Sequence, residues 1–104
     1  MSKNVRFLGR EPQGIDERVA YQIDTALIGT PTAPSVVAKA RAGGSTWVDV
    51  TSTVFPTNTP GVSGTVITLS LLRNLTQDVL YRIEIQYTIG GNLFENIIEI
   101  LAEL

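Results

Sequence analysis

Hydrophobic and polar residues alternate most regularly near the end of the chain, within residues 75–101, around a Gly-Gly pair. The segment YRIEIQYTI at 81–89 has an apolar side chain at every second position, which is the period of a half-buried β-strand. Gly90 and Gly91 follow it and supply the two positive-φ residues of a tight type I′ turn. We therefore predict a β-hairpin closed by a two-residue loop.

The length of this loop determines which residues face one another across the hairpin. Five pairs form an aromatic and aliphatic ladder on one face: Ile89–Asn92, Tyr87–Phe94, Ile85–Asn96, Ile83–Ile98 and Tyr81–Ile100. Asn96 is the one misfit in this ladder. On the other face Arg82 meets Glu99 and Gln86 meets Glu95, a pattern typical of a solvated surface. Because a shift by one residue would mix the two faces, the pattern selects this register.

Earlier segments show the same alternation in shorter stretches, separated by Gly and Pro. We predict strands over 18–25, 35–40, 46–55 and 65–72, the last with Ile67, Leu69 and Leu71 directed inward, and a break near Ser52. The intervening PTNTPGVSG is a loop or a poorly paired edge, because its prolines cannot donate to a ladder. About seven short antiparallel strands without a convincing helix predict an all-β fold, an immunoglobulin-like β-sandwich. Helical spacing at the C-terminus allows a terminal helical turn, but the hairpin pairing outweighs it.

The first residues mix charge, Gly and Pro with a short apolar patch. We predict an N-terminal arm or short edge strand over 1–16, with a turn at 11–14 (EPQG), and a sandwich domain over 17–104. Phe7 either covers one end of the core or docks on a neighbouring subunit. Chain ends are poorly ordered unless something ties them down, which favours the first alternative.

Leu75 lies six residues before Tyr81, with turn-forming residues between them. This spacing resembles the tyrosine corner of immunoglobulin-like sandwiches, in which a phenol at the start of the penultimate strand bonds a backbone group a few residues upstream. We assign structural roles to Leu75, Tyr81, Gly90 and Gly91.

Composition narrows the classes of function. The 104-residue chain is long enough for one domain with its own core. A net charge of −2 gives no electrostatic basis for nucleic acid or an anionic membrane as the main partner. No apolar run approaches the roughly 20 residues that span a bilayer, and the polar start MSKNVR does not match a secretion signal.

Residues that usually carry chemistry are scarce. The chain has no Cys and no His, which removes disulfides, thiolate metal sites and the usual general base. Asp16, Glu17 and Asp24 resemble paired carboxylates, but nothing in the sequence desolvates them. The Gly-Gly pairs lack the context of a phosphate-binding loop. We therefore expect a non-enzymatic protein with no catalytic residue, cofactor or metal.

Two features are candidates for protein–protein contact. Trp47 has the opposite parity to Val48 and Val50, so it is either a core residue at a strand start or an anchor in an interface, where Trp is enriched. Three apolar residues fall on the nominally polar face of the last strand, which indicates a covered surface: Leu93, Ile97 and Leu101. Together with Phe7 and Trp47 they form the candidate interface.

Five segments carry a resemblance to a known family: FLGREP at 7–12, YQID at 21–24, DVTSTV at 49–54, GVSGTVITLSLLRNL at 61–75 and YRIEIQYTIGGNLFE at 81–95. With them the chain resembles the small immunoglobulin-like virion proteins of tailed phages and prophages, of the fibre–tail adaptor type. Related proteins often carry a Trp-containing segment after the YxID motif, where this chain reads TALIG. The resemblance implies a structural component of the virion, assembled in the bacterial host cytoplasm, that docks to other virion proteins at the head–tail joint, tail or fibre base. It also implies a homo-oligomer in the assembled particle.

Two other functions fit the residues less well. A carbohydrate-binding or adhesive sandwich module needs a cluster of exposed aromatic residues, and only Trp47 and one Tyr are candidates. A hydrolase would have to work with Ser or carboxylates in the absence of His. We therefore expect a docking protein without a small-molecule substrate, nucleic acid or membrane as its partner.

Overall fold

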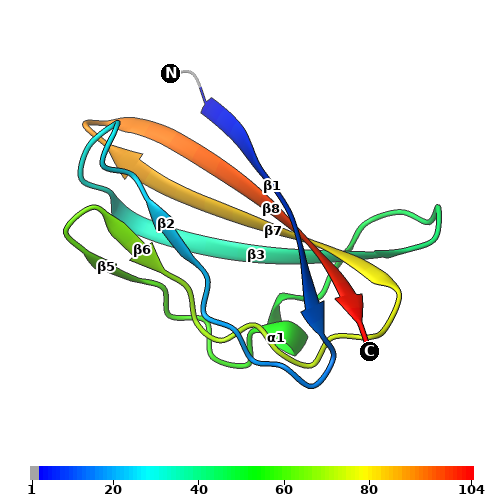
Figure 1. Ribbon diagram of the computed structural model, residues 1–104. Helices are drawn as coiled ribbons and strands as arrows, with labels where there is room; N and C mark the ends of the chain where they lie inside the picture. The colour runs from blue at the N-terminus through cyan, green and yellow to red at the C-terminus, as the bar shows by residue number, and fades with distance from the viewer. Residues whose placement is uncertain (1–2) are drawn as a thin grey trace.

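The computed structural model describes residues 3–104, with side chains described from residue 8 onward. This part of the chain forms eight strands and one single-turn helix in two facing sheets (Figure 1). The elements are β1 (Lys3–Gly14), β2 (Gln22–Asp24), β3 (Thr32–Ala42), β4 (Val48–Asp49), α1 (Thr51–Val54), β5 (Gly61–Ser63), β6 (Val66–Thr68), β7 (Val79–Ile89) and β8 (Asn92–Glu103). The larger sheet has the order β1-β8-β7-β3-β4 and the smaller β2-β6-β5. The predicted all-β class is confirmed.

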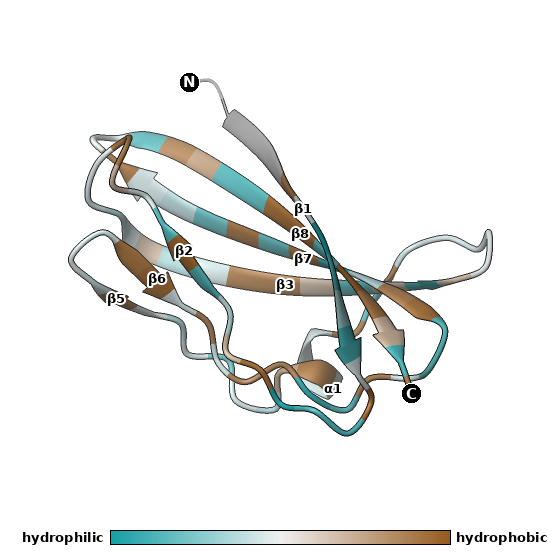
Figure 2. Cartoon of the chain, in the orientation of Figure 1, coloured by the Kyte–Doolittle hydropathy of each residue, from teal (hydrophilic) through white to brown (hydrophobic). Residues whose placement is uncertain are grey.

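β7 and β8 form the predicted hairpin in the predicted register, from Ile89 opposite Asn92 to Tyr81 opposite Ile100. Gly90 and Gly91 have φ values of 57° and 82°, the left-handed region that a type I′ turn requires. Figure 2 shows hydrophobic and hydrophilic residues alternating along both strands. Since β8 continues to Glu103, the alternative of a terminal helical turn is wrong.

β1 differs from the prediction in two ways. It runs parallel to β8 at the edge of the larger sheet, with a bulge between Phe7 and Gly9, so the expectation of purely antiparallel strands is wrong. It also continues through the predicted turn at 11–14 to Gly14. The side chain of Gln13 explains the extension. It is 1% exposed, donates to the carbonyl of Leu72 at 2.8 Å, and accepts from the Tyr21 hydroxyl at 2.8 Å.

The segment predicted as a strand over 46–55 forms only β4 and then α1. The Asp49 carboxylate accepts both the backbone N–H of Thr51 at 2.9 Å and its hydroxyl at 2.8 Å, an arrangement that turns the chain. These two hydrogen bonds, the backbone one foremost, hold the pKa of Asp49 below its ordinary value. The predicted break near Ser52 therefore takes the form of one helical turn.

Side chains close the edge of β3 beyond the short β4. The N–H of Ala38 donates to the Thr51 hydroxyl oxygen at 2.9 Å, and the carbonyl of Val36 accepts from the Asn58 amide at 3.0 Å. The carbonyl of Ala38 accepts from the N–H of Val50 at 2.9 Å. Backbone groups that would otherwise be free to pair with another strand are therefore occupied.

The core lies between the two sheets and is completed by residues around α1. Its largest fully buried apolar side chains are Tyr87, Phe55, Ile67, Leu72, Ile83, Ile85, Ile100 and Val54. Leu71 was predicted to point inward with Ile67 and Leu69, but it is 47% exposed. β6 ends at Thr68, so the alternation stops there, and Leu72 takes the buried place while its backbone pairs with Val19.

The turn before β7 contains the bond that the Leu75–Tyr81 spacing predicts. The backbone N–H of Thr76 donates to the hydroxyl oxygen of Tyr81 at 2.8 Å. Tyr81 is 4% exposed and Leu75 7% exposed, so both pack in the core while the hydroxyl anchors the loop above them.

Candidate functional site

The face of the five-stranded sheet turned away from the smaller sheet carries the most distinctive surface chemistry. We call it the outer face. It is formed by the side chains that alternate with the buried ones on β3, β7 and β8: Val37, Lys39, Arg41, Leu80, Arg82, Glu84, Gln86, Leu93, Glu95, Ile97, Glu99 and Leu101. Trp47, from the connection between β3 and β4, lies over this face.

Ion pairs cross the middle of the outer face. The register aligns Lys39, Arg82, Glu99 and Arg10 in one row across four strands. Arg10 holds one carboxylate oxygen of Glu99 at 2.8 Å, and Arg82 approaches the other at 3.9 Å. Lys39 lies 3.4 Å from Glu84 on the neighbouring strand.

The face is less solvated than predicted. Glu99 is only 8% exposed and Glu95 7% exposed; Glu95 accepts from the Gln86 amide at 3.3 Å. The expected pairs are therefore present, but the expectation of a solvated surface is wrong for both glutamates. Glu99 is sequestered because two guanidinium groups reach it from opposite neighbours, Arg10 on β1 and Arg82 on β7.

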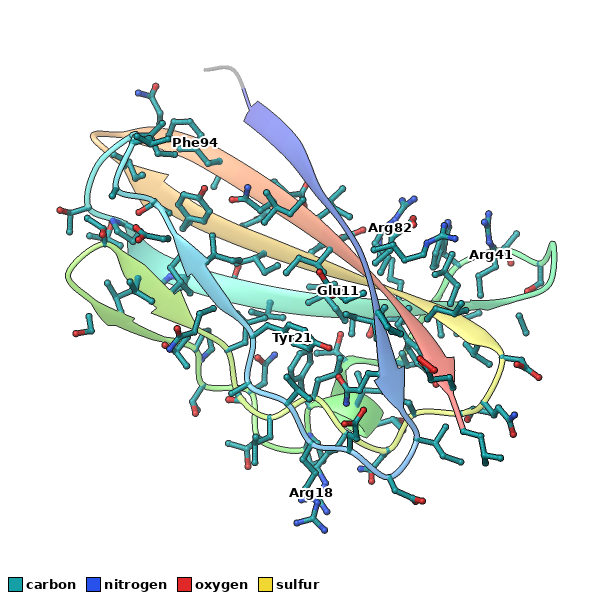
Figure 3. The ribbon with its side chains drawn as sticks, viewed as in Figure 1. Glu11, Arg18, Tyr21, Arg41, Arg82 and Phe94 are labelled. Carbon is teal, nitrogen blue, oxygen red and sulfur yellow. The ribbon has the colours of Figure 1, made fainter. Side chains whose placement is uncertain are left out.

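Trp47 is held between two arginines of the outer face. The guanidinium carbon of Arg82 lies 4.5 Å from the centroid of its ring and that of Arg41 lies 4.7 Å away. Figure 3 shows Arg41 and Arg82 pointing to the same side of the sheet. Cation–π contacts of this kind contribute about 0.5–1 kcal/mol each at an exposed site. Trp47 lies outside the core and is partly exposed. The structure therefore excludes the interpretation of Trp47 as a core residue.

The other candidate residues share the outer face but do not form one cluster. Leu101 is 41% exposed and pairs with Leu80 at the Trp47 end of the sheet. Leu93 pairs with Thr88 beside the hairpin turn, about 26 Å from Leu101 along the strand at about 3.3 Å per residue; Ile97 lies between them. Phe7 is aligned with Ile97 through its backbone, but its side chain lies outside the described residues.

Two hollows open at the ends of the core. One of about 280 Å³ lies near β2 and includes Ile23, Tyr87 and Asn96; the Oδ1 atom of Asn96 has no hydrogen-bond partner among the described residues. The other, about 320 Å³, lies between the inner side of the β3–β4 hairpin and α1, and is largely apolar, with Val48 58% exposed at its rim. Asp24 and Thr25 both line the first hollow, but the Thr25 hydroxyl donates to the carbonyls of Gly29 and Thr65 and not to the Asp24 carboxylate.

Carboxylates gather at the opposite edge of the sheet. Asp16, Glu17 and Glu103 line one shallow hollow at the end of β1 and β8, and Glu17 accepts the N–H of Gly14 at 2.6 Å. Burial, followed by the charges of Glu11 and Glu17, raises the pKa of Tyr21 to about 12. Carboxylates therefore outnumber the cations near this edge, where Arg18 and Arg73 line an adjoining hollow.

Over residues 3–104 no group of three or more Asp, Glu, His or Cys residues is placed to hold a metal ion. No helix in that part of the chain is long and apolar enough to cross a membrane. No protein-family model matches the chain, and a comparison with curated proteins finds no match.

The sequence pairs Arg82 with Glu99, but it does not show that Arg41 and Arg82 contact Trp47 or that Arg10 reaches Glu99. Arg41 and Arg82 are outward-facing positions of two neighbouring strands, a signal present in the alternation itself. What the alternation does not contain is the pairing of β3 with β7 that brings them to the same indole. Arg10 reaches Glu99 from 89 positions away in the sequence, and only the parallel placement of β1 makes that contact.

Proposed function

We propose that this protein is a non-enzymatic structural protein of a tailed phage or prophage virion, and that it docks to other virion subunits through the outer face. Its localisation is the particle, assembled in the bacterial host cytoplasm. Its partners are other virion proteins and further copies of itself, without a nucleic acid, membrane, cofactor or small-molecule substrate.

The observation that carries the docking role is the Arg41–Trp47–Arg82 stack. Trp and Arg are the residue types most enriched among those that dominate binding energy at protein interfaces. Here they lie together on a sheet face, partly exposed, beside the exposed Leu101. An aromatic ring already held by its neighbours loses little conformational entropy when a partner covers it.

The finer fold proposed is an immunoglobulin-like sandwich. Its support is the strand order: β2-β6-β5 in one sheet and β8-β7-β3 in the other correspond to the B-E-D and G-F-C strands of that architecture. The tyrosine corner at the start of β7 falls on the corresponding F strand. β1 departs from the simplest form, because it lies beside β8 and not beside β2.

The alternative, a carbohydrate-binding or adhesive module, has weaker support. Sugar stacking requires an open aromatic ring, but two guanidinium groups lie over Trp47, and Tyr81 and Tyr87 are 4% and 1% exposed. A glycan array probed with the purified protein tests this alternative directly, and strong binding to one sugar class would favour it over the docking role.

The docking role is tested in the strain that encodes the protein. Particles are induced, purified on a density gradient and analysed by quantitative mass spectrometry. We expect the chain in the particle fraction at a fixed ratio to the tail proteins, and we expect Trp47→Ala to reduce that ratio at least tenfold. Val62→Ala, at an exposed position on β5 of the other sheet, is the matched control. Absence of the wild-type chain from intact particles would refute the proposal.

A further inference from the structure

Side chains of opposite charge are separated across one end of the five-stranded sheet. We use the name basic edge for Lys39 and Arg41 on β3, Arg82 on the central strand β7 and Trp47 over them, and the name acidic edge for Glu11, Asp16, Glu17 and Glu103 on the β1 side. The row Arg41–Leu80–Leu101–Pro12 connects them across four strands. Three strand spacings of about 4.8 Å separate its ends by roughly 14 Å.

One cation of the basic edge, Arg41, has no carboxylate partner of its own within residues 8–104. Lys39 pairs with Glu84 and also lies opposite Asp49 on β4, and Glu99 is shared between Arg10 and Arg82. Arg41 has no ion pair among the described side chains. The Nε atoms of both Arg41 and Arg82 also lack a hydrogen-bond acceptor there.

The acidic edge has carboxylates without an ion-pair partner in the described part of the chain. None of its four carboxylates forms an ion pair with a described side chain, and all four residues are exposed. Arg18 and Arg73 line an adjoining hollow with Asp16 and Glu17, so four carboxylates against two guanidinium groups still leave negative charge. The raised pKa of Tyr21 has the charges of Glu11 and Glu17 among its causes.

We propose that the basic edge of one copy of this chain binds the acidic edge of the next copy. Carboxylates of one subunit would reach the guanidinium groups that flank Trp47 in the other, a charge-assisted contact well suited to Arg. A two-fold contact of either edge with itself would oppose like charges; the proposed contact joins unlike edges of successive copies, head to tail. Such a contact generates a ring if the rotation closes and a filament if it does not. This inference deepens the proposed function, because it names a second copy as the partner at these edges.

The test is the mass of the purified chain by sedimentation velocity at low and high salt. We expect the mass to rise with concentration at 50 mM salt and to return to that of one chain at 500 mM, because exposed charges are screened. We expect Arg41→Glu to weaken association at least tenfold, and the double variant Asp16→Lys with Glu103→Lys to do the same. Arg41, Asp16 and Glu103 form no ion pair with a described side chain, and Arg41→Glu loses only the contact with the Trp47 ring, so we expect folding to survive; circular dichroism of each variant checks this.

A mixture of the two variants gives the decisive result. Each retains one intact edge, so a head-to-tail contact predicts a complex of two chains that grows no further. A mixture that stays monomeric while the wild type associates would overturn the proposal, as would a wild type that is monomeric at its solubility limit. Val62→Ala is the control that should associate like the wild type. The particle analysis is independent: a monomeric protein found in virions would refute the inference and leave the proposed function standing.

Discussion

Replacing Tyr81 with Phe removes one hydroxyl and leaves the packing of the ring intact. That hydroxyl accepts the N–H of Thr76 at 2.8 Å and anchors the turn before β7. Because the ring stays in place, no cavity forms, and the cost is the lost hydrogen bond plus the desolvation of the freed N–H. A net hydrogen bond contributes about 0.5–1.5 kcal/mol, and a stranded buried group costs about 1–3 kcal/mol. Thr76 itself lies at the surface, so water can partly satisfy its freed N–H. We therefore expect the free energy of unfolding to fall by about 1–2 kcal/mol.

The assay is equilibrium unfolding in urea, followed by far-ultraviolet circular dichroism. Each 1 kcal/mol lowers the thermal midpoint by about 4–8 °C for a domain of about 100 residues, so we expect a shift of about 4–16 °C, with an unchanged urea m-value. Ser63→Ala also removes a hydroxyl, from an exposed position on β5, and should change stability by less than about 0.5 kcal/mol.

Hydrogen exchange of the Thr76 amide provides the local readout. Its exchange in the native state should accelerate in Tyr81→Phe while amides in the middle of β7 keep their protection relative to global stability. An unchanged midpoint together with an unchanged Thr76 amide would refute the reasoning, since the bond would then contribute nothing to the fold.

Three further predictions follow from backbone geometry and from titration. Gly90→Ala should destabilise the hairpin by about 1 kcal/mol, because φ is 57° with no atom near the new Cβ, so the cost is backbone strain alone. Gly29→Ala should cost more than Gly90→Ala, because its φ is 129° and the new Cβ would meet the Ile89 side chain at 2.8 Å; Gly44→Ala, where φ is not in that region and space is open, is the control for both in urea unfolding. Since the pKa of Tyr21 is raised from 10.0 to about 12, its neutral form is favoured in the folded state, so its contribution is fully present below pH 10 and is lost as the pH rises toward 12. Tyr21→Phe should flatten that alkaline decline in unfolding free energy, and an identical slope in both proteins would contradict the assignment.

The parts of the fold that the sequence predicts are those specified by neighbouring residues. The β7–β8 register follows from a two-residue loop, since Gly90 and Gly91 leave no other pairing that keeps the faces separate. The tyrosine corner likewise follows from the spacing of six residues between Leu75 and Tyr81. Both depend on contacts within a short stretch of chain, where spacing alone carries geometric information.

The parts that it does not predict depend on distant contacts or on a competing local bond. The parallel position of β1 cannot be obtained from alternation, because a strand's pattern shows which face is buried and not which neighbour it joins. The burial of Glu99 follows from that position through Arg10. The strand expected around Ser52 failed because the Asp49 side chain competes with the ladder for the backbone of Thr51. The sequence identifies Trp47 as a candidate but not its two arginines, because only the pairing of β3 with β7 brings Arg41 and Arg82 to its ring.

The side chains of Thr51 and Asn58 hydrogen-bond the backbone at the edge of β3. These bonds affect the tendency of the protein to aggregate at high concentration. An edge strand with unpaired backbone N–H and C=O groups can pair with the edge strand of another molecule. Repeated pairing of this kind leads to insoluble fibres. With three of its backbone groups occupied, this stretch of β3 offers a neighbouring molecule less backbone to pair with. Contact on this side then depends more on side chains, and contacts between exposed charges weaken as the salt concentration rises.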